Sequence, residues 1–126
     1  MVTTLQRLLL VLTFLSGLLA GMYLTAVSRE GHAQSAEVAA AIHEASVANG
    51  VSEGWLRRIA YCESRYTPWV TSRGGHMGLF QYAQGTWRWM STQAGYAGAS
   101  PYDPRAAAMV TGWALAHDLS GHWACR

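Results

Sequence analysis

A glutamate on an apolar helix face is the group in this sequence best suited to acid catalysis. Glu63 lies in the stretch WLRRIAYCES, and helical spacing places it on one face with three residues that favour burial: Trp55, Ile59 and Cys62. A carboxylic acid held against apolar groups loses hydration, which raises its pKa and keeps it protonated near neutral pH. Cleavage of a glycosidic bond requires a proton donor of this kind.

The other acids beyond residue 33 have simpler interpretations. Asp103 precedes Pro104 and is expected to cap a helix. Asp118 falls near a helix C-terminus, where the helix dipole disfavours a negative charge. Three glutamates occur on early helical turns, where we expect them to be solvated: Glu37, Glu44 and Glu53. Glu63 is therefore the expected catalytic acid, and an ordinary surface glutamate at a helix end is the alternative.

Composition limits the cofactors and partners. The formal net charge is only +2 at pH 7. A nucleic-acid-binding protein would need a basic patch, so we expect no nucleic-acid partner. The histidines show none of the familiar metal-ligand spacings, so we expect no metal and no cofactor. Of the six tryptophans, three are assigned to the core because each buries a large apolar area: Trp55, Trp87 and Trp113.

The first part of the chain has the pattern of a secretory signal. Residues 8–27 form a nearly uncharged apolar run that follows Arg7 and precedes small residues. Gly31-His32-Ala33 favours cleavage after Ala33, and residues 26–28 offer a second cleavage site. The run is also about long enough to span a bilayer, so an uncleaved anchor is the alternative.

Domain organisation and localisation follow from this pattern. We expect residues 1–33 to be a signal peptide or an N-terminal anchor and residues 34–126 to form one domain. The protein is then secreted or associated with the cell envelope. Two cysteines occur, and in an exported protein an even number favours a disulfide, here between Cys62 and Cys125.

Capping and turn signals place Glu63 at the end of the second of four expected helices. The alanine-rich stretch 35–49 is the first helix and stops at Asn49-Gly50. Ser52 is expected to cap the second helix, and Thr67-Pro68 ends helical structure after it. The acid is thus expected close to the loop that follows.

That loop and two more helices complete the expected fold. Residues 70–82 are glycine-rich and predict a short hairpin or an irregular loop. Thr86 is expected to cap the third helix, which Gly95 closes, and Asp103-Pro104 to start a fourth helix that runs to about Asp118. The inward-facing residues of the fourth helix are expected to be Ala106, Met109, Val110, Trp113 and Ala116. The fold class is a small, mainly α domain with one glycine-rich loop and one disulfide.

Three short motifs in order resemble a known enzyme superfamily. Cys62-Glu63-Ser64, Gly78-Leu79-Phe80-Gln81 and Thr86-Trp87 resemble the lysozyme-like lytic transglycosylases of the SLT type, and are even more similar to the resuscitation-promoting factors. The resemblance spans about residues 52–126 and includes further matches at Trp55, Trp69, Gln84, Trp123 and Cys125. It implies an α+β lysozyme-like fold. It also implies cleavage of the β-1,4 bond between N-acetylmuramic acid and N-acetylglucosamine in peptidoglycan, with Glu63 as general acid and base.

The resemblance also implies substrate-binding residues. Gln81 and Thr86 would line the sugar groove and Trp87 would support it, together with Ser64, Gly78 and Tyr82. The chain departs from the SLT pattern, because Gly78 to Tyr82 reads Gly-Leu-Phe-Gln-Tyr where SLT proteins often have Gly-Leu-Met-Gln-Ile. The later Tyr-Asn-Ala-Gly motif is missing, so Tyr82 and Tyr102 are candidates for a tyrosine partner of the acid. Hydrolysis and formation of a 1,6-anhydro ring both remain open.

Two other functions are compatible with the same residues. Cys62, with His117 or His122 as base, would suit a cysteine peptidase or amidase that acts on peptidoglycan stem peptides. A cell-wall-binding module would keep the groove and lack the chemistry. The disulfide expected in an exported protein argues against the first of these, because it removes the nucleophilic thiol.

Overall fold

The computed structural model describes residues 3–124, and within them the regular structure is helical. The chain divides between Gln34 and Ser35 into two units. Helix α1 (Thr4–Asn49) belongs to both units, because no proline interrupts it. The sequence predicted a helix only from residue 35, so the observed helix begins about thirty residues earlier.

The described residues of the N-terminal unit lie almost entirely in α1 and include its apolar run. Its side chains are exposed, including Leu9, Phe14 and Leu19, and its mean hydropathy reaches 2.0. By length and composition this helix could cross a membrane, and a signal sequence near the N-terminus has the same properties. The choice between a cleaved signal and an anchor therefore stays a prediction.

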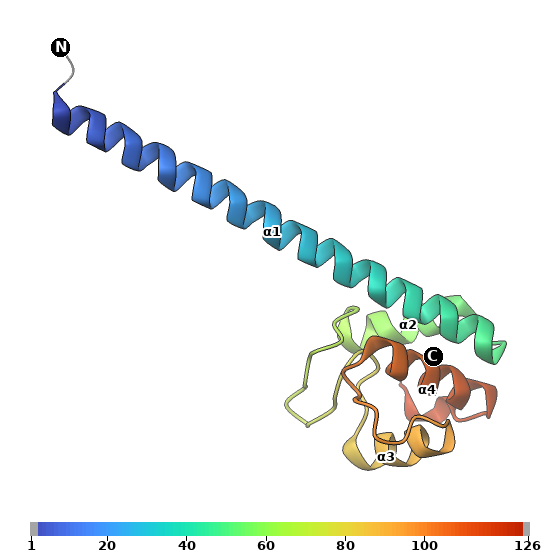
Figure 1. The fold of residues 1–126 in the computed structure, drawn as a ribbon. Helices are drawn as coiled ribbons and strands as arrows, with labels where there is room; N and C mark the ends of the chain where they lie inside the picture. The colour runs from blue at the N-terminus through green and yellow to red at the C-terminus, as the bar shows by residue number, and fades with distance from the viewer. Residues whose placement is uncertain (1–2, 125–126) are drawn as a thin grey trace. The chain divides into compact units, whose positions relative to one another are not determined.

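The second unit builds its core from four helices. The last turns of α1 contribute Val38, Ala41, Ile42 and Ala45, the three-and-four spacing of a buried helix face. They are followed by α2 (Glu53–Ser64), α3 (Gln84–Gln93), α4 (Pro104–Ala116) and the short 3-10 helix η1 (Ser120–His122). Helix α4 packs against both α2 and α3 (Figure 1). This confirms the predicted small, mainly helical domain.

Most helix boundaries follow the predicted signals. Gly50 has φ +64° after α1, the Ser52 side chain accepts a hydrogen bond from the Trp55 N–H, and Asp103 caps α4 ahead of Pro104. The Thr86 cap was wrong: α3 begins at Gln84 after Ala83, whose side chain makes no cap.

The inward face of α4 differs in part from the predicted one. Ala106 and Val110 are buried as expected, and Met109 and Trp113 pack at the edge of the core. Ala116 is exposed, whereas Leu115 is buried. The helix ends at Ala116 instead of continuing to Asp118, and a hydrogen-bonded turn follows it.

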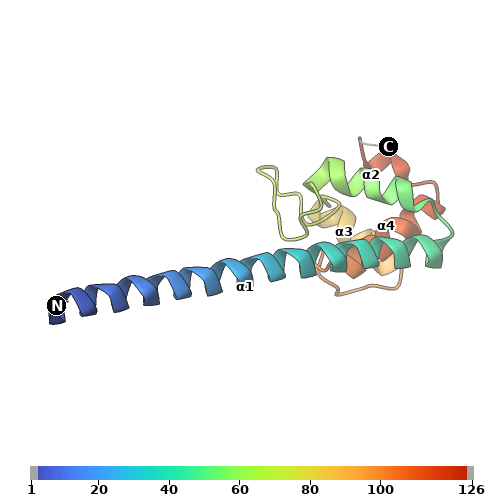
Figure 2. The same ribbon diagram turned by 90° about the horizontal axis from the view of Figure 1, so that it is seen from above.

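Residues 70–82 form an irregular loop with two isolated antiparallel bridges, Thr71 with Met77 and Met77 with Tyr82. In both views the loop extends to one side of α2, α3 and α4 (Figures 1 and 2). Gly78 has φ +76°, and a Cβ atom there would lie 2.0 Å from the Pro101 carbonyl oxygen. Glycine is therefore required where this loop meets the segment before α4. The expected disulfide involves Cys125, which lies outside the described residues, so the bridge stays a prediction.

Gly78→Ala tests this contact. We expect it to lower the free energy of unfolding by about 2–4 kcal/mol, because the new methyl group combines a left-handed backbone with a clash against backbone. Gly85→Ala is the matched control, since a Cβ atom at Gly85 would meet no other atom within 4 Å and alanine favours helices. Urea unfolding of both variants measures the difference, and equal stability of the two would contradict the assignment.

Candidate functional site

Glu63 continues the buried face of α2 into its last turn. It follows Leu56, Ile59 and Ala60 by seven, four and three residues, and all three are fully buried. Glu63 itself is partly buried. Loss of hydration raises the pKa of its carboxyl above the ordinary value, and the nearby charge of His76 partly offsets this rise. The protonated form of Glu63 therefore persists to higher pH than in a fully hydrated glutamate.

The expected companions of Glu63 are buried to different degrees. Ile59 is fully buried and Trp55 packs at the edge of the core. The prediction that Cys62 shares the buried face was wrong, because Cys62 is exposed. Its position is one residue, or about 100°, away from that of Glu63 around the helix.

Ser64 fixes the end of α2 against the glycine-rich loop. Its side chain is buried, and its hydroxyl oxygen lies 2.8 Å from the Leu79 carbonyl oxygen and 3.1 Å from that of Ala60. The same oxygen accepts a hydrogen bond from the Thr67 N–H. These contacts occupy Ser64 within the protein and hold Leu79 beside the last turn of α2.

The backbone after Ser64 turns sharply. Arg65 and Tyr66 have φ of 52° and 61°, and their N–H groups donate to the Tyr61 and Ala60 carbonyl oxygens. Left-handed backbone at two non-glycine residues costs free energy. The turn therefore depends on the surrounding contacts, and it leads the chain directly from the acid into the loop.

His76 is the charged neighbour that acts on Glu63. The Ser72 N–H donates to the His76 carbonyl oxygen at 2.9 Å, and the His76 N–H donates to the Ser72 hydroxyl at 3.1 Å. These bonds hold a tight turn within the loop. Across residues 3–124, no hydrogen bond joins the Glu63 carboxyl to another group, so burial and the charge of His76 set its pKa.

Gly78 and Gln81, two of the predicted groove residues, stabilise this loop. The Gln81 side-chain amide donates to the Gly78 carbonyl oxygen at 2.9 Å and to that of Val70 at 3.3 Å. Gln81 is partly buried and has φ +52°. Its amide oxygen still has capacity to accept a hydrogen bond.

Tyr82 and Trp87 are core residues. Tyr82 is 2% exposed, and its ring packs edge-on against Trp87 and Trp123. Its hydroxyl lies 2.7 Å from the Thr111 hydroxyl, which itself donates to the Ala107 carbonyl. Tyr82 is therefore the donor of this pair. Burial raises the pKa of Tyr82, so its phenol stays protonated.

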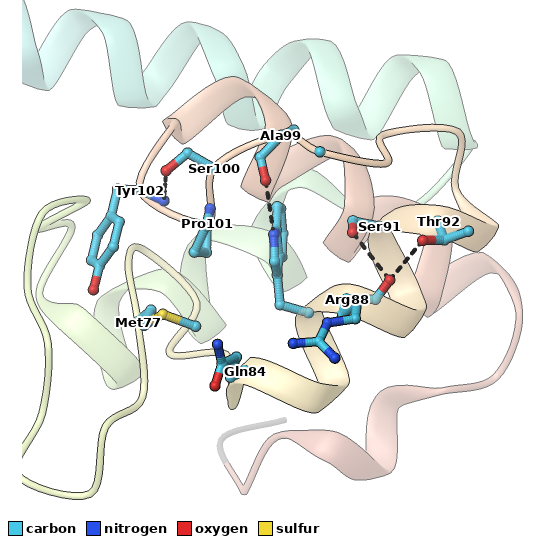
Figure 3. A pocket seen from close by; sticks show the side chains of 11 residues that line it. Met77, Gln84, Arg88, Ser91, Thr92, Ala99, Ser100, Pro101 and Tyr102 are labelled. Atoms are coloured by element: carbon cyan, nitrogen blue, oxygen red, sulfur yellow. Dashed lines mark hydrogen bonds between the residues drawn. The ribbon is translucent and has the colours of Figure 1, made fainter.

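A pocket of about 320 Å³ opens between α3 and the segment before α4 (Figure 3). The lining residues come from the glycine-rich loop, from α3 and from residues 98–102: Met77, Gln84, Trp87, Arg88, Ser91, Thr92, Gly98, Ala99, Ser100, Pro101 and Tyr102. Of the predicted groove residues only Trp87 lines it, and its indole N–H donates to the Ala99 carbonyl at 2.9 Å. Glu63 and Thr86 do not line this pocket.

Sequence reasoning missed most of this pocket. Glycines and Pro101 mark residues 95–101 as a loop, but no local signal shows that this loop packs across α3. Gln84 was recognised only as a motif match, and its spacing of four from Arg88 places both on one face of α3.

One comparison with known proteins gives a match. The family model described as "Transglycosylase SLT domain" matches residues 40–122. No curated protein and no solved structure matches the chain. The family model covers α2, the glycine-rich loop, α3 and α4, and so includes Glu63 and the pocket.

Tyr82→Phe tests whether this tyrosine is a partner of the acid. We expect a loss of about 1 kcal/mol in unfolding free energy, because one buried hydrogen bond disappears, and unchanged cleavage of peptidoglycan, because the phenol faces the core. Tyr102→Phe is the control at the other candidate tyrosine. Denaturant unfolding and muropeptide release measure the two effects, and a large loss of activity in the stably folded Tyr82 variant would contradict the core assignment.

Proposed function

We propose that this chain, which belongs to the transglycosylase SLT domain family, cleaves the β-1,4 bond between N-acetylmuramic acid and N-acetylglucosamine with Glu63 as general acid and base. Family membership indicates a peptidoglycan-cleaving enzyme of the lytic transglycosylase type. One observation carries the choice of acid: Glu63 extends the fully buried face of α2 and its carboxyl loses hydration there.

The proposed reaction uses one carboxyl twice. The protonated Glu63 donates to the glycosidic oxygen as the bond from that oxygen to the sugar C1 breaks, which leaves an oxocarbenium-like centre. The Glu63 carboxylate then removes a proton from the nucleophile that attacks C1. The nucleophile is the 6-hydroxyl of the muramic acid, which gives an anhydro product, or water, which gives a reducing end.

No second protein carboxyl enters this scheme. Within the part of the chain that the structure describes, His76 is the charged group that shifts the pKa of Glu63, and no carboxylate contributes to that shift. Stabilisation of the oxocarbenium-like centre then falls to the substituents of the substrate. Six residues are proposed to form the walls or supports of the groove: Ser64, Gly78, Gln81, Tyr82, Thr86 and Trp87.

Among those six, the side-chain contacts suggest different roles. Gln81 and Thr86 are partly buried and are the proposed sugar contacts. Ser64 and Tyr82 use their hydroxyls in hydrogen bonds to protein groups, and Gly78 permits a close backbone approach. We propose that these three act by holding the groove in shape.

Export and a disulfide complete the proposal. Residues 1–33 would direct the chain across the membrane as a cleaved signal or hold it there as an anchor, with residues 34–126 in the cell envelope, where peptidoglycan lies. A bridge between Cys62 and Cys125 would fasten the end of the chain next to Glu63. It would also remove the thiol that a cysteine peptidase needs.

Glu63→Gln tests the assignment of the acid. Glutamine keeps the size and cannot donate the proton, so we expect release of muropeptides to fall by about 10³-fold or more, with an unchanged melting temperature. Glu37→Gln is the matched control, since Glu37 is an exposed glutamate in the same unit. Mass spectrometry of muropeptides released from purified wall provides the measurement and identifies anhydro or hydrolytic products. Undiminished turnover by the Glu63 variant would refute the proposal.

The pH dependence of cleavage tests the electrostatics of Glu63. A raised pKa means that the acid form persists to higher pH, so the rate is retained below that pKa and is lost as the pH rises through it. His76→Ala removes the charge that lowers this pKa, so the alkaline limb should move to higher pH. His117→Ala is the control, because His117 does not contribute to the shift. A limb that stays in place in the His76 variant, or moves to lower pH, would contradict this account.

A further inference from the structure

The pocket beside α3 shares Trp87 with the proposed groove, and its other lining residues have no part in the catalytic proposal. One of its surfaces is the Trp87 indole, which is buried and held by its hydrogen bond to the Ala99 carbonyl. Pro101 and Met77 add apolar surface. Rigid apolar walls with a few polar groups are typical of a site for a small molecule or for one unit of a polymer.

Most hydroxyl groups of the pocket are already engaged. The Ser91 and Thr92 hydroxyls donate to the Arg88 carbonyl oxygen at 3.4 and 2.8 Å. The Tyr102 hydroxyl lies 2.6 Å from the Thr71 hydroxyl. The Gln84 amide and the Arg88 guanidinium make no side-chain hydrogen bond within residues 3–124. Both groups are on α3, one turn apart, and Figure 3 shows them extending from that helix.

The charge of the pocket is positive. Arg88 is exposed and makes no ion pair with any described residue, whereas Arg57 and Arg105 pair with Glu53 and Glu44. Every other residue of the lining is uncharged. A planar guanidinium next to an amide donor is suited to a carboxylate, which it can bind through two parallel hydrogen bonds.

The pocket and the acid are joined by one loop. His76 acts electrostatically on Glu63, and the next residue, Met77, lines the pocket. Met77 is also held in both bridges of the loop. The loop segment that acts on Glu63 therefore continues directly into one side of the pocket.

We propose that this pocket binds a carboxylate carried by the lactyl side of a muramic acid residue, with Arg88 as the anion-binding group and Gln84 as a second donor. The proposal rests on the proposed function, which makes the glycan strand the substrate. The carboxylate is the free lactyl group in a strand without peptides, or a carboxylate of the stem peptide in a strand that carries them. N-acetylglucosamine has no such group. A strand would therefore bind with a muramic acid residue, and not an N-acetylglucosamine residue, at the pocket.

Binding of three soluble probes to the full chain in detergent micelles tests this selectivity. The probes are a disaccharide–tetrapeptide muropeptide, the same disaccharide with a free lactyl carboxylate, and N,N′-diacetylchitobiose, which has no carboxylate. The Glu63→Gln background prevents turnover, so that binding is measured apart from catalysis. The indole N–H resonance of Trp87, assigned with Trp87→Phe, reports occupancy of the pocket, and calorimetry gives the dissociation constants.

We expect Arg88→Gln to weaken at least one carboxylate-bearing probe about tenfold, the typical effect of losing a charge-assisted hydrogen bond, and to leave diacetylchitobiose unchanged. Arg88→Lys should recover part of the affinity, because it keeps the charge and loses the bidentate geometry. Arg58→Gln, an exposed arginine of α2 outside the pocket lining, should have no effect. The probe that loses affinity identifies whether the lactyl or the peptide carboxylate is bound.

Two results would overturn the proposal. One is unchanged affinity of Arg88→Gln for both carboxylate-bearing probes, and the other is an equal loss for diacetylchitobiose. A failure of the catalytic proposal alone would give a different result. These probes would bind normally, and the chain with Glu63 intact would not cleave the wall.

Discussion

Burial of one face of α2 along its whole length is the constraint on which the site depends. Leu56, Ile59 and Ala60 fill the core, and the same face reaches Glu63 in the last turn. The helix cannot turn this carboxyl fully into water without withdrawing those three side chains, at a cost of about 1.5–3 kcal/mol for each large one. The raised pKa of Glu63 is therefore a consequence of packing in the hydrophobic core.

The glycine-rich loop packs against the end of α2 and forms the rest of the candidate site. Ser64 joins α2 to Leu79, and Gly78 brings the loop against Pro101. The loop thus connects the acid on one side to the pocket on the other. Its polar groups mostly bind its own backbone, as the Gln81 amide shows, so the loop is a rigid support with few groups left for a ligand. The pocket donors that make no side-chain hydrogen bond among the described residues, Arg88 and Gln84, come from α3 instead.

Local patterns in the sequence predicted the helix ends and the loop, which depend on residues close together in the chain. The caps at Ser52 and Asp103, the stop at Gly50 and the irregular glycine-rich loop were all confirmed, because each depends on residues close in the chain. The family was also predicted and is shown by the match over residues 40–122. Glu63 was placed on an apolar face by its spacing, and it lies on that face.

The features that were not predicted from the sequence depend on contacts between distant segments of the chain. Trp123 was recognised only as a motif match, yet it is buried with its indole N–H donating to the Phe80 carbonyl, 43 residues away. Tyr82 was assigned to the groove by resemblance, whereas its hydroxyl pairs with Thr111 in the core. The pocket itself required residues 98–102 to fold back over α3, and no periodic pattern encodes that approach.

Loss of hydration at the end of the buried face of α2 raises the pKa of Glu63. The most direct measurement is an NMR titration of the full chain in micelles, in which the side-chain carboxyl ¹³C shift of Glu63 is followed against pH and assigned with Glu63→Gln. We expect a pKa for Glu63 above the ordinary glutamate value of 4.5. A measured pKa at or below 4.5 would contradict this effect of burial.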